Sequence, residues 1–310
     1  MQTDTDIEYK TSEPVESRSC SAVVGVPRRR RGGFRFRDIR FKAEGFILPL
    51  LFLVVWEIGA RMVDNPALVP RFTAVVGVLI HPNAELIGTG SLFWNTMVSL
   101  VRVLLGFLVA VIICVPLGLA MGSSRRIFRM VNPMVEMFRP LCPIAWIPFA
   151  MAIVKTTRLP QLFGLRYSDT ILDSVQVGMI FIIFWGGLFP ILLNTIYGVS
   201  GVRDIWLETA KMLGASKTRT FRKIVIPAAL PAIMTGLRIG LGVSWMVIIA
   251  AEMLPGSDSG IGYLIMYSYE LAEMHILVAS MVVIGIMGLF LNKGLQFVSN
   301  QVSGWTARER

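Results

Sequence analysis

DIWLETAKMLGASKTRTFRKIVIPAALP, residues 204–231, is a basic stretch between two long apolar runs. Its first ten residues place apolar and polar side chains at the period of an amphipathic helix, and Gly214 is a typical helix stop. Ser216 can cap a second short helix that ends at Lys223, before Pro227. We therefore expect two short helices joined at a glycine. They would form a compact knob between two apolar helices.

The composition of the chain indicates that most of it is embedded in a lipid bilayer. Of its 310 residues, 54% are hydrophobic and 16% are charged, whereas a soluble domain has about 25% charged residues. A spanning helix needs roughly 20 mainly apolar residues, because the bilayer has no water to pair its backbone groups. We predict an all-α membrane protein with six transmembrane helices, at 46–63, 96–121, 133–154, 175–200, 228–253 and 276–298.

Basic residues divide the connections between these runs into two sides. Residues 28–42 hold eight basic residues against one acid, and the second-to-third and fourth-to-fifth connections are also basic. In contrast, 255–275 has no Lys or Arg. Cytoplasmic loops hold the excess of Lys and Arg, so both termini are predicted to be cytoplasmic. The connection 155–174, which has both signs of charge, is the exception. The basic residues of the two connections are Arg125, Arg126, Arg129, Arg203, Lys211, Lys217, Arg219, Arg222 and Lys223.

These patterns divide the chain into a tail, a membrane domain and a second tail. Residues 1–43 are predicted to be a disordered basic cytoplasmic tail that can meet anionic lipid. Residues 44–300 form the transmembrane domain and include the knob, and 301–310 form a cytoplasmic tail.

Several functional classes lack the residues that they would need. Cys20, Cys114 and Cys142 have no paired spacing, and His81 and His275 lie far apart outside the apolar runs. No phosphate-binding Gly-x4-Gly-Lys-Ser/Thr loop occurs, so this chain lacks the usual element that cradles a nucleotide. We therefore expect no metal, no cofactor and no catalytic residues in this chain. The net charge of +10 is concentrated beside the first apolar run, which indicates a membrane surface rather than a nucleic acid.

Prolines and glycines predict how two of the runs are built. Three prolines in the third run each remove a backbone donor and would break its helix. Small residues four apart, in the second and fifth runs, allow helices to approach closely. The prolines are Pro140, Pro143 and Pro148, and the glycine pairs are Gly118 with Gly122 and Gly236 with Gly240.

The knob resembles the signature loop of binding-protein-dependent ABC importer permeases. Its sequence Glu208-Thr-Ala210, three residues, Gly214, nine residues and Ile224-Val-Ile-Pro227 matches the family pattern Glu-Ala-Ala, Gly and Ile-x-Leu-Pro. Thr209 and Ile226 are conservative departures. The resemblance extends over about 95–298, where the chain is similar to the nitrate, sulfonate, taurine and bicarbonate subgroup.

The resemblance implies a type I (MetI-like) permease fold in the bacterial inner membrane. It implies a second permease copy, two cytoplasmic ATPases that use ATP and magnesium, and an extracytoplasmic binding protein. The cargo would be a small anion of the nitrate, sulfonate or bicarbonate type. The residues that would couple to the ATPase are Glu208, Thr209, Ala210, Gly214, Ile224 and Pro227.

Ionisable and aromatic residues inside the runs are candidates for the translocation path. Arg139 begins the proline-broken segment, and an anion path needs a positive group. We expect Arg139, Trp146, Trp245 and Glu252 to line the path. For Glu57 and Arg61 an i,i+4 pair is expected. For Arg102, Arg238 and Glu252, snorkelling or pairing across helices is the alternative to a path role.

The sequence leaves three questions open. The knob can also be an interfacial helix that lies on anionic headgroups. The chain can be a gradient-driven transporter or channel that works without an ATPase, although we find no clear repeat or mid-membrane acid typical of that class. The segment 156–174 is longer than in the subgroup, and it either alters docking of a binding protein or only decorates the surface.

Overall fold

The computed structural model describes residues 36–154, 174–254 and 256–302. Contacts divide the chain into two compact units, residues 1–51 and 52–310. The first unit includes the start of helix α1 at Phe36, which falls inside the predicted tail. The rest of that tail up to residue 35, the segment 155–173 and residues 303–310 lie outside the described residues, so the predictions for them stay predictions.

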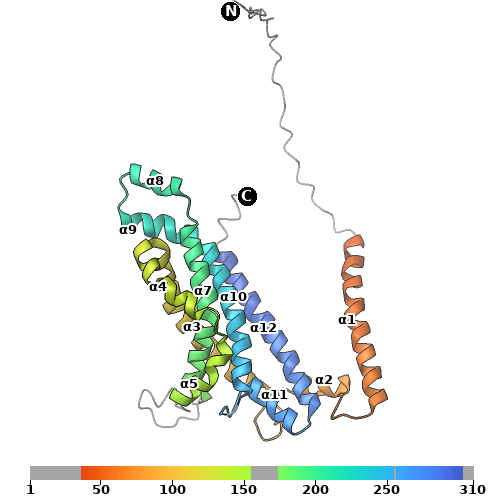
Figure 1. The fold of residues 1–310 in the computed structure, drawn as a ribbon. Coiled ribbons are helices and arrows are strands. Elements are labelled where there is room, and N and C mark those ends of the chain that lie inside the picture. Colours follow the sequence, from red (N-terminus) through yellow and green to blue (C-terminus); the bar gives the residue numbers. More distant parts are fainter. Residues whose placement is uncertain (1–35, 155–173, 255, 303–310) are drawn as a thin grey trace, which may run out of the picture. The chain divides into compact units, whose positions relative to one another are not determined.

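The described residues are helical apart from loops and one isolated bridge, Glu85 with Ser91. Figure 1 shows the arrangement of the helices. They are α1 (Phe36–Val63), α2 (Phe72–Ile80), α3 (Leu92–Ser123), α4 (Arg125–Phe138), a 3₁₀ turn (Pro143–Trp146), α5 (Ile147–Val154), α7 (Val177–Ser200), α8 (Asp204–Met212), α9 (Lys217–Thr220), a π-helical turn (Phe221–Val225), α10 (Ile226–Glu252), α11 (Ile261–Glu270) and α12 (Met274–Val302).

Four of the described helices are long and apolar enough to cross a membrane. They are Leu92–Ser123, Val177–Ser200, Lys217–Glu252 and Met274–Val302. They correspond to the second, fourth, fifth and sixth predicted runs. The other two runs correspond to α1 and to the interrupted pair α4 and α5, so the count of six spans stays a prediction.

The third run is broken as its prolines predict. Helix α4 ends at Phe138, and the chain turns through Pro140 into the 3₁₀ turn that opens at Pro143. The helix before the break begins at Arg125, two turns earlier than predicted, because the Ser124 hydroxyl accepts from the Ile127 N–H and caps it.

Helix α7 is the centre of the bundle and packs on both α3 and α10. A Cβ added to Gly118 would lie 2.7 Å from the Thr195 side chain of α7, and one added to Gly240 would lie 2.7 Å from Ile191. Both distances are shorter than a carbon–carbon contact allows. The glycines of α3 and α10 therefore let both helices lie directly against α7, which confirms the predicted packing role.

The last turns of α1 are tied to the start of α2. Trp56 Nε1 donates to the carbonyl of Pro70 at 3.2 Å. The Glu57 carboxylate accepts from the Phe72 N–H at 2.9 Å and pairs with Arg61 at 2.9 Å. This confirms the expected i,i+4 pair.

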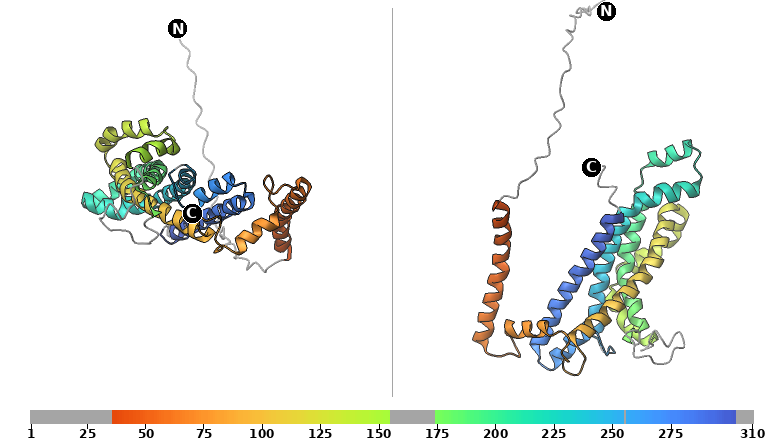
Figure 2. Two further views of the ribbon diagram at one scale, coloured as in Figure 1. Left: turned by 90° about the horizontal axis from the view of Figure 1, so that it is seen from below. Right: turned by 180° about the vertical axis from the view of Figure 1, so that it is seen from behind.

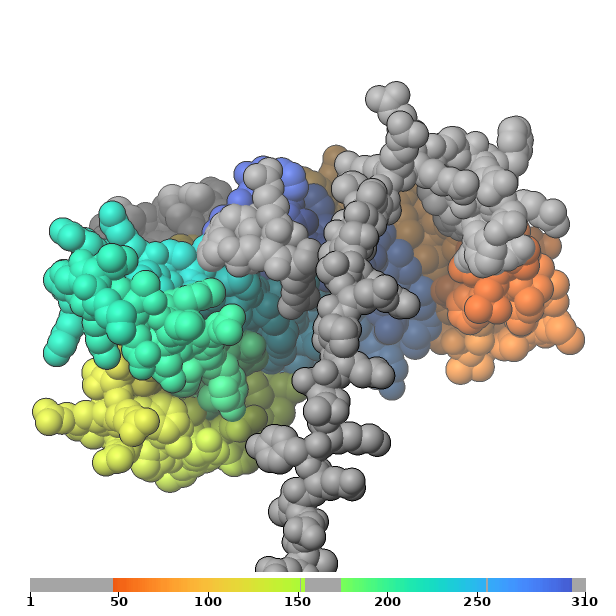
Figure 3. Space-filling model, turned by 90° about the horizontal axis from the view of Figure 1, so that it is seen from above, coloured from red at the N-terminus to blue at the C-terminus, as the bar shows by residue number. Residues whose placement is uncertain are grey.

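The two ends of the bundle differ in what they carry. Figures 1 and 2 show α8 and α9 at one end with the start of α4, and α11 at the opposite end with the start of α12. Figure 3 looks onto the end with α8, where the surface of α8 and α9 stands beside that of α4. We call this the knob end and the other the α11 end. The basic second-to-third and fourth-to-fifth connections thus lie at one end of the bundle.

Candidate functional site

The knob begins with helix α8, and its end at Gly214 is a Schellman motif. Gly214 has φ +70°, a left-handed conformation that glycine adopts without strain. The Ala215 N–H bonds to the carbonyl of Ala210 at 3.0 Å, and the Gly214 N–H bonds to that of Lys211 at 3.0 Å. These two bonds are the pair that defines the motif. Gly214 is therefore a conformational requirement of the turn, as its place in the sequence predicts.

The second half of the knob differs from the prediction. Ser216 caps a helix as expected, with its hydroxyl 3.4 Å from the Arg219 N–H. That helix does not end at Lys223. It continues through a π-helical turn at Phe221–Val225 into α10, so that Lys217–Glu252 is one helix of 36 residues. Pro227 lies in the first turn of α10, directly after the π-helical turn. Proline has no backbone N–H to donate, and the wider π-helical turn before it lets the helix continue past this residue.

The knob is attached to the bundle on one side and exposed on the other. Ala210 is buried and Leu207 is half-buried, next to a groove of about 470 Å³ that the ends of α3 and α7 also line. On the outer side, Ile205, Met212 and Leu213 are 59%, 87% and 82% exposed. Exposed apolar groups of this size within a basic segment are typical of surfaces that bind protein or lipid.

The remaining predicted coupling residues occupy both sides of this surface. Glu208 and Thr209 are exposed, and the Thr209 hydroxyl donates back to the carbonyl of Ile205 at 2.7 Å. Ile224 and Pro227 are half-buried on the continuous helix. The structure thus places these predicted coupling residues on two consecutive helical segments, α8 and the start of the helix that continues into α10, both at the knob end.

The four residues predicted to line the path lie in four different environments. Arg139 is exposed at the end of α4, beside the proline break. Trp146 packs on Trp185, with ring centroids 4.6 Å apart, inside an aromatic cluster. Trp245 is 5% exposed and its Nε1 donates to the Ile284 carbonyl at 3.2 Å. Glu252 is fully buried in a polar network at the α11 end.

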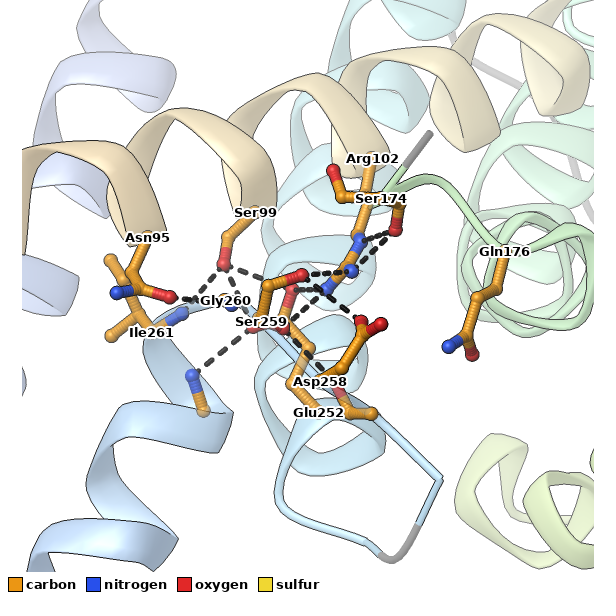
Figure 4. Close-up of polar contacts among 12 residues, drawn as sticks. Asn95, Ser99, Arg102, Ser174, Gln176, Glu252, Asp258, Ser259, Gly260 and Ile261 are labelled. Carbon is orange, nitrogen blue, oxygen red and sulfur yellow. Dashed lines mark hydrogen bonds and ion pairs between the residues drawn. The ribbon is translucent and has the colours of Figure 1, made fainter. Parts of the chain in front are cut away.

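That network is centred on an ion pair between Arg102 of α3 and Glu252 of α10 (Figure 4). Arg102 Nη1 lies 2.8 Å from Glu252 Oε1, and both side chains have no solvent exposure. Glu252 also accepts from the Ser99 hydroxyl, at 2.7 Å to Oε2, and from the Gly262 N–H at 3.1 Å. Gly262 is in the first turn of α11, whose amide dipoles favour a negative charge there. The carboxylate is therefore saturated by donors.

The Arg102 guanidinium is saturated in the same way by the loops at this end. Nε and Nη2 both donate to the carbonyl of Ser174, the first at 3.0 Å. Nη1 donates to the carbonyl of Ser259 and Nη2 to its hydroxyl, at 2.8 and 2.9 Å. Asn95 completes the network, because its Oδ1 accepts from the Gly260 N–H at 2.9 Å. The network thus joins α3, the approach to α7, the end of α10 and the start of α11.

Sequence reasoning anticipated a pairing of Arg102 and Glu252 across helices as one alternative, but it missed the residues around them. Asn95, Ser99 and Arg102 stand at positions i, i+4 and i+7, and so form a polar stripe on one face of an apolar helix. That spacing was the available signal. Gly260, whose φ is +113°, leaves room for the Glu252 carboxylate, which a Cβ would overlap.

The described residues contain no group of three or more His, Cys, Asp or Glu side chains placed to hold a metal ion. The free cysteines among them are Cys114 and Cys142.

Comparisons with known proteins agree on one family. The family model described as "binding-protein-dependent transport system inner membrane component" matches residues 103–303. A putative ABC transporter permease protein of Methanocaldococcus jannaschii is 44% identical over 258 residues, which are 83% of this chain and 90% of that protein. The bicarbonate transport system permease protein CmpB of Synechococcus elongatus is 33% identical over 283 residues, or 87% and 95% of the two chains.

A solved structure is similar in fold. A chain of the MetNI methionine ABC transporter, in a structure described as inward facing, matches with a TM-score of 0.54 at 16% identity. The match covers 68% of this chain and 95% of that chain. It confirms the predicted MetI-like helical fold.

Proposed function

The chain belongs to the family of binding-protein-dependent transport system inner membrane components, and we propose that its knob is the surface through which a separate ATPase drives transport. As a member of that family it is a multi-pass membrane protein and a permease subunit of an ABC importer, and it is not itself an enzyme. The family depends on a substrate-binding protein and an ATPase as partners.

One observation carries the proposal for the knob. Its attached side is anchored by Ala210 and Leu207, whereas Ile205, Met212 and Leu213 point outward with most of their surface uncovered. The Schellman turn at Gly214 holds α8 at a defined angle to the continuous helix Lys217–Glu252. Because that helix includes α10, which ends at Glu252 at the α11 end, we infer that a displacement of α8 is transmitted through it towards that end.

A binding experiment in detergent tests this assignment against the headgroup alternative. We expect the ATPase subunit to co-purify with the wild-type permease in detergent micelles, and Leu213→Asp to weaken that association by about tenfold or more, as for loss of a buried apolar anchor. Thr218→Asp, an exposed polar position in the same segment, is the matched control and should leave binding unchanged. If Leu213→Asp binds the ATPase normally but reduces attachment of the isolated knob peptide to anionic vesicles, the knob is a lipid-binding element.

The further properties of the complex are part of the same proposal. We propose a small anion of the nitrate, sulfonate or taurine, or bicarbonate type as cargo, two copies of this chain, and both termini in the cytoplasm with the knob end inward. The two ATPases would bind the ATP and magnesium. The relative that transports bicarbonate supports this cargo class.

Of the four residues predicted to line the path, we retain three. Arg139 and Trp146 lie at the break of the third run, and Trp245 lines a groove between α10 and α12. Glu252 is held by Arg102, Ser99 and Gly262, so we assign it a structural position.

The gradient-driven alternative is tested by reconstitution. The ABC assignment requires that vesicles with the permease alone take up no nitrate or bicarbonate, and that uptake appears with ATPase, ATP and binding protein. Uptake by the permease alone, driven by an ion gradient, would contradict it.

A further inference from the structure

A groove of about 490 Å³ runs between α10 and α12 on the surface of the bundle. Its lining is mainly apolar, with Trp245 and Met246 of α10 and Leu289 of α12 among its walls. Two polar side chains interrupt this lining, Arg238 of α10 and Asn292 of α12. An apolar groove with a few convergent polar groups is the usual form of a small-ligand site.

The lengths of the helices place Arg238 within the span expected for the hydrocarbon core of a membrane. On the neighbouring helix α7, Gly236 is opposite Asn194 and Gly240 is opposite Ile191. Arg238 is therefore level with about residue 192 of α7, which is about 12 Å from the end of that helix at Ser200, at 1.5 Å per residue. The apolar region of a bilayer is about 30 Å thick. A charge at this depth requires a polar partner or a water-filled path.

Within the described residues, Arg238 has no such partner. Its Nε is buried and has no hydrogen-bond partner there. The sequences of α3, α7 and α12 contain no Asp or Glu, and the one acid of α10 is Glu252, which Arg102 already holds. By contrast, the guanidinium of Arg102 is fully satisfied. Arg238 is thus a cation about two helical turns inside the bundle, and within the described residues α3, α7, α10 and α12 supply no free carboxylate to it.

Asn292 stands at the same depth as Arg238 on the opposite wall. Trp245 Nε1 bonds to the Ile284 carbonyl, which fixes the register of α10 against α12. Arg238 is seven residues from Trp245 towards the knob end, and Asn292 is eight residues from Ile284 in the same direction. Both are therefore about 11 to 12 Å from that bond. A guanidinium and an amide facing one groove supply N–H donors for the oxygens of a planar anion.

We propose that Arg238 and Asn292 form a contact point for the transported anion inside the translocation path, in a groove that a second copy of this chain closes. This rests on the proposed function as an anion importer and adds the residues that meet the cargo. The groove is flanked by Met246 and Leu289, which are 73% and 61% exposed. If the second copy covers Met246 and Leu289, lipid is excluded from the groove. The side chains of Arg238 and Asn292 would then form a polar site for an anion between the two subunits.

Charge replacement at Arg238 is the main test. The complete complex of permease, ATPase and binding protein is reconstituted, and ATP-driven uptake of nitrate, bicarbonate and taurine is measured beside ATP hydrolysis. We expect Arg238→Gln to reduce uptake by about tenfold or more, as for the loss of a charged contact, while hydrolysis stimulated by binding protein is retained. Arg238→Lys should recover part of the uptake. Lys293→Gln, on the same helix as Asn292 but outside the groove lining, is the control and should match the wild type.

A second variant keeps the test decisive if Arg238→Gln does not assemble. Asn292→Asp places a carboxylate opposite Arg238 and so occupies the site with an internal counter-ion, which should preserve folding and lower uptake. Wild-type uptake by Arg238→Gln, or by Asn292→Asp where the first variant does not assemble, would overturn the proposal. The proposed function itself fails only if the wild-type complex shows no ATP-dependent uptake of nitrate, bicarbonate or taurine.

Cross-linking tests whether the groove faces a second copy of the chain or faces lipid. Met246→Cys in a background without other cysteines should give a cross-linked dimer with a short bis-maleimide. Labelling of Cys-substituted position 246 by a lipid-soluble maleimide, with no dimer formed, would show that the groove faces lipid and that Arg238 reaches towards a headgroup. That outcome would overturn the proposal.

Discussion

Arg102 and Glu252 are 150 residues apart in the sequence and form a fully buried ion pair 2.8 Å long. The pair joins α3 to the end of α10, and its other donors and acceptors bond to Ser174, to Ser259 and to the first turn of α11. Two charges without water are tolerated only when each is saturated by partners, and here both are.

Breaking one half of this pair should destabilise the protein strongly. Glu252→Gln removes the negative charge and leaves the buried guanidinium of Arg102 unpaired, at a cost of about 3 to 5 kcal/mol. The double variant Arg102→Met with Glu252→Leu should recover a large part of that loss. Unfolding of detergent-solubilised protein measures both. A single variant as stable as the wild type would show that the pair is not buried.

Gly260→Ala should disturb the same end of the bundle by a different cause. Its φ of +113° is unfavourable for alanine, and the added Cβ would overlap the Glu252 carboxylate. We expect a loss of at least about 2 kcal/mol from strain and steric overlap together. Gly256→Ala, which also has a positive φ but no neighbour within 4 Å, isolates the backbone contribution. Equal losses in both variants would argue against the contact with Glu252.

Gly214→Asp should leave the protein inserted and folded but uncouple transport from ATP hydrolysis. Gly214 has φ +70° and open space around it, so the substitution acts through the Schellman turn rather than through a clash. A left-handed conformation costs a non-glycine residue about 1 kcal/mol or more, so we expect the turn that sets the direction of α8 to be weakened. ATP hydrolysis and uptake are measured in the same vesicles. Normal uptake at a normal ratio to hydrolysis would contradict the role of this turn.

Glu208→Lys should also uncouple, without any change in folding. Glu208 is exposed on α8, so reversal of its charge changes the docking surface and not the core. We expect reduced affinity for the ATPase and reduced uptake, with a normal unfolding transition. Lys211→Glu is a reciprocal charge reversal on the same helix and tests whether the sign of charge at position 208 matters specifically. Unchanged uptake in Glu208→Lys would remove this residue from the coupling surface.

Gly118→Ala should separate α3 from α7. The new Cβ would lie 2.7 Å from Thr195 and 3.1 Å from the Leu192 carbonyl, so the helices must move apart, at about 1 to 3 kcal/mol. Gly294→Ala on α12, which meets nothing within 4 Å, is the control and should be neutral or slightly stabilising, since alanine favours a helix. Similar stability of the two variants would contradict the close packing.

Several parts of the fold and site could be predicted from the sequence because their signals are local. The Schellman turn at Gly214, the cap at Ser216 and the break at Pro140 each depend on residues within one or two turns. The end of the second short helix was placed wrongly, because Pro227 is normally a stop signal and a π turn lets the helix continue past it.

Composition and short-range spacing are enough to predict the all-helical membrane class, the basic knob and the family that the knob resembles. Each of these follows from composition or from residues a few positions apart, where helix periodicity and capping act. The packed helices alone show that Arg102 is fully paired, whereas the buried Nε of Arg238 has no hydrogen-bond partner within the described part of the chain. The reason is that partners across helices depend on the register between α3, α7, α10 and α12, which is set by where small residues such as Gly118 and Gly240 let the helices meet.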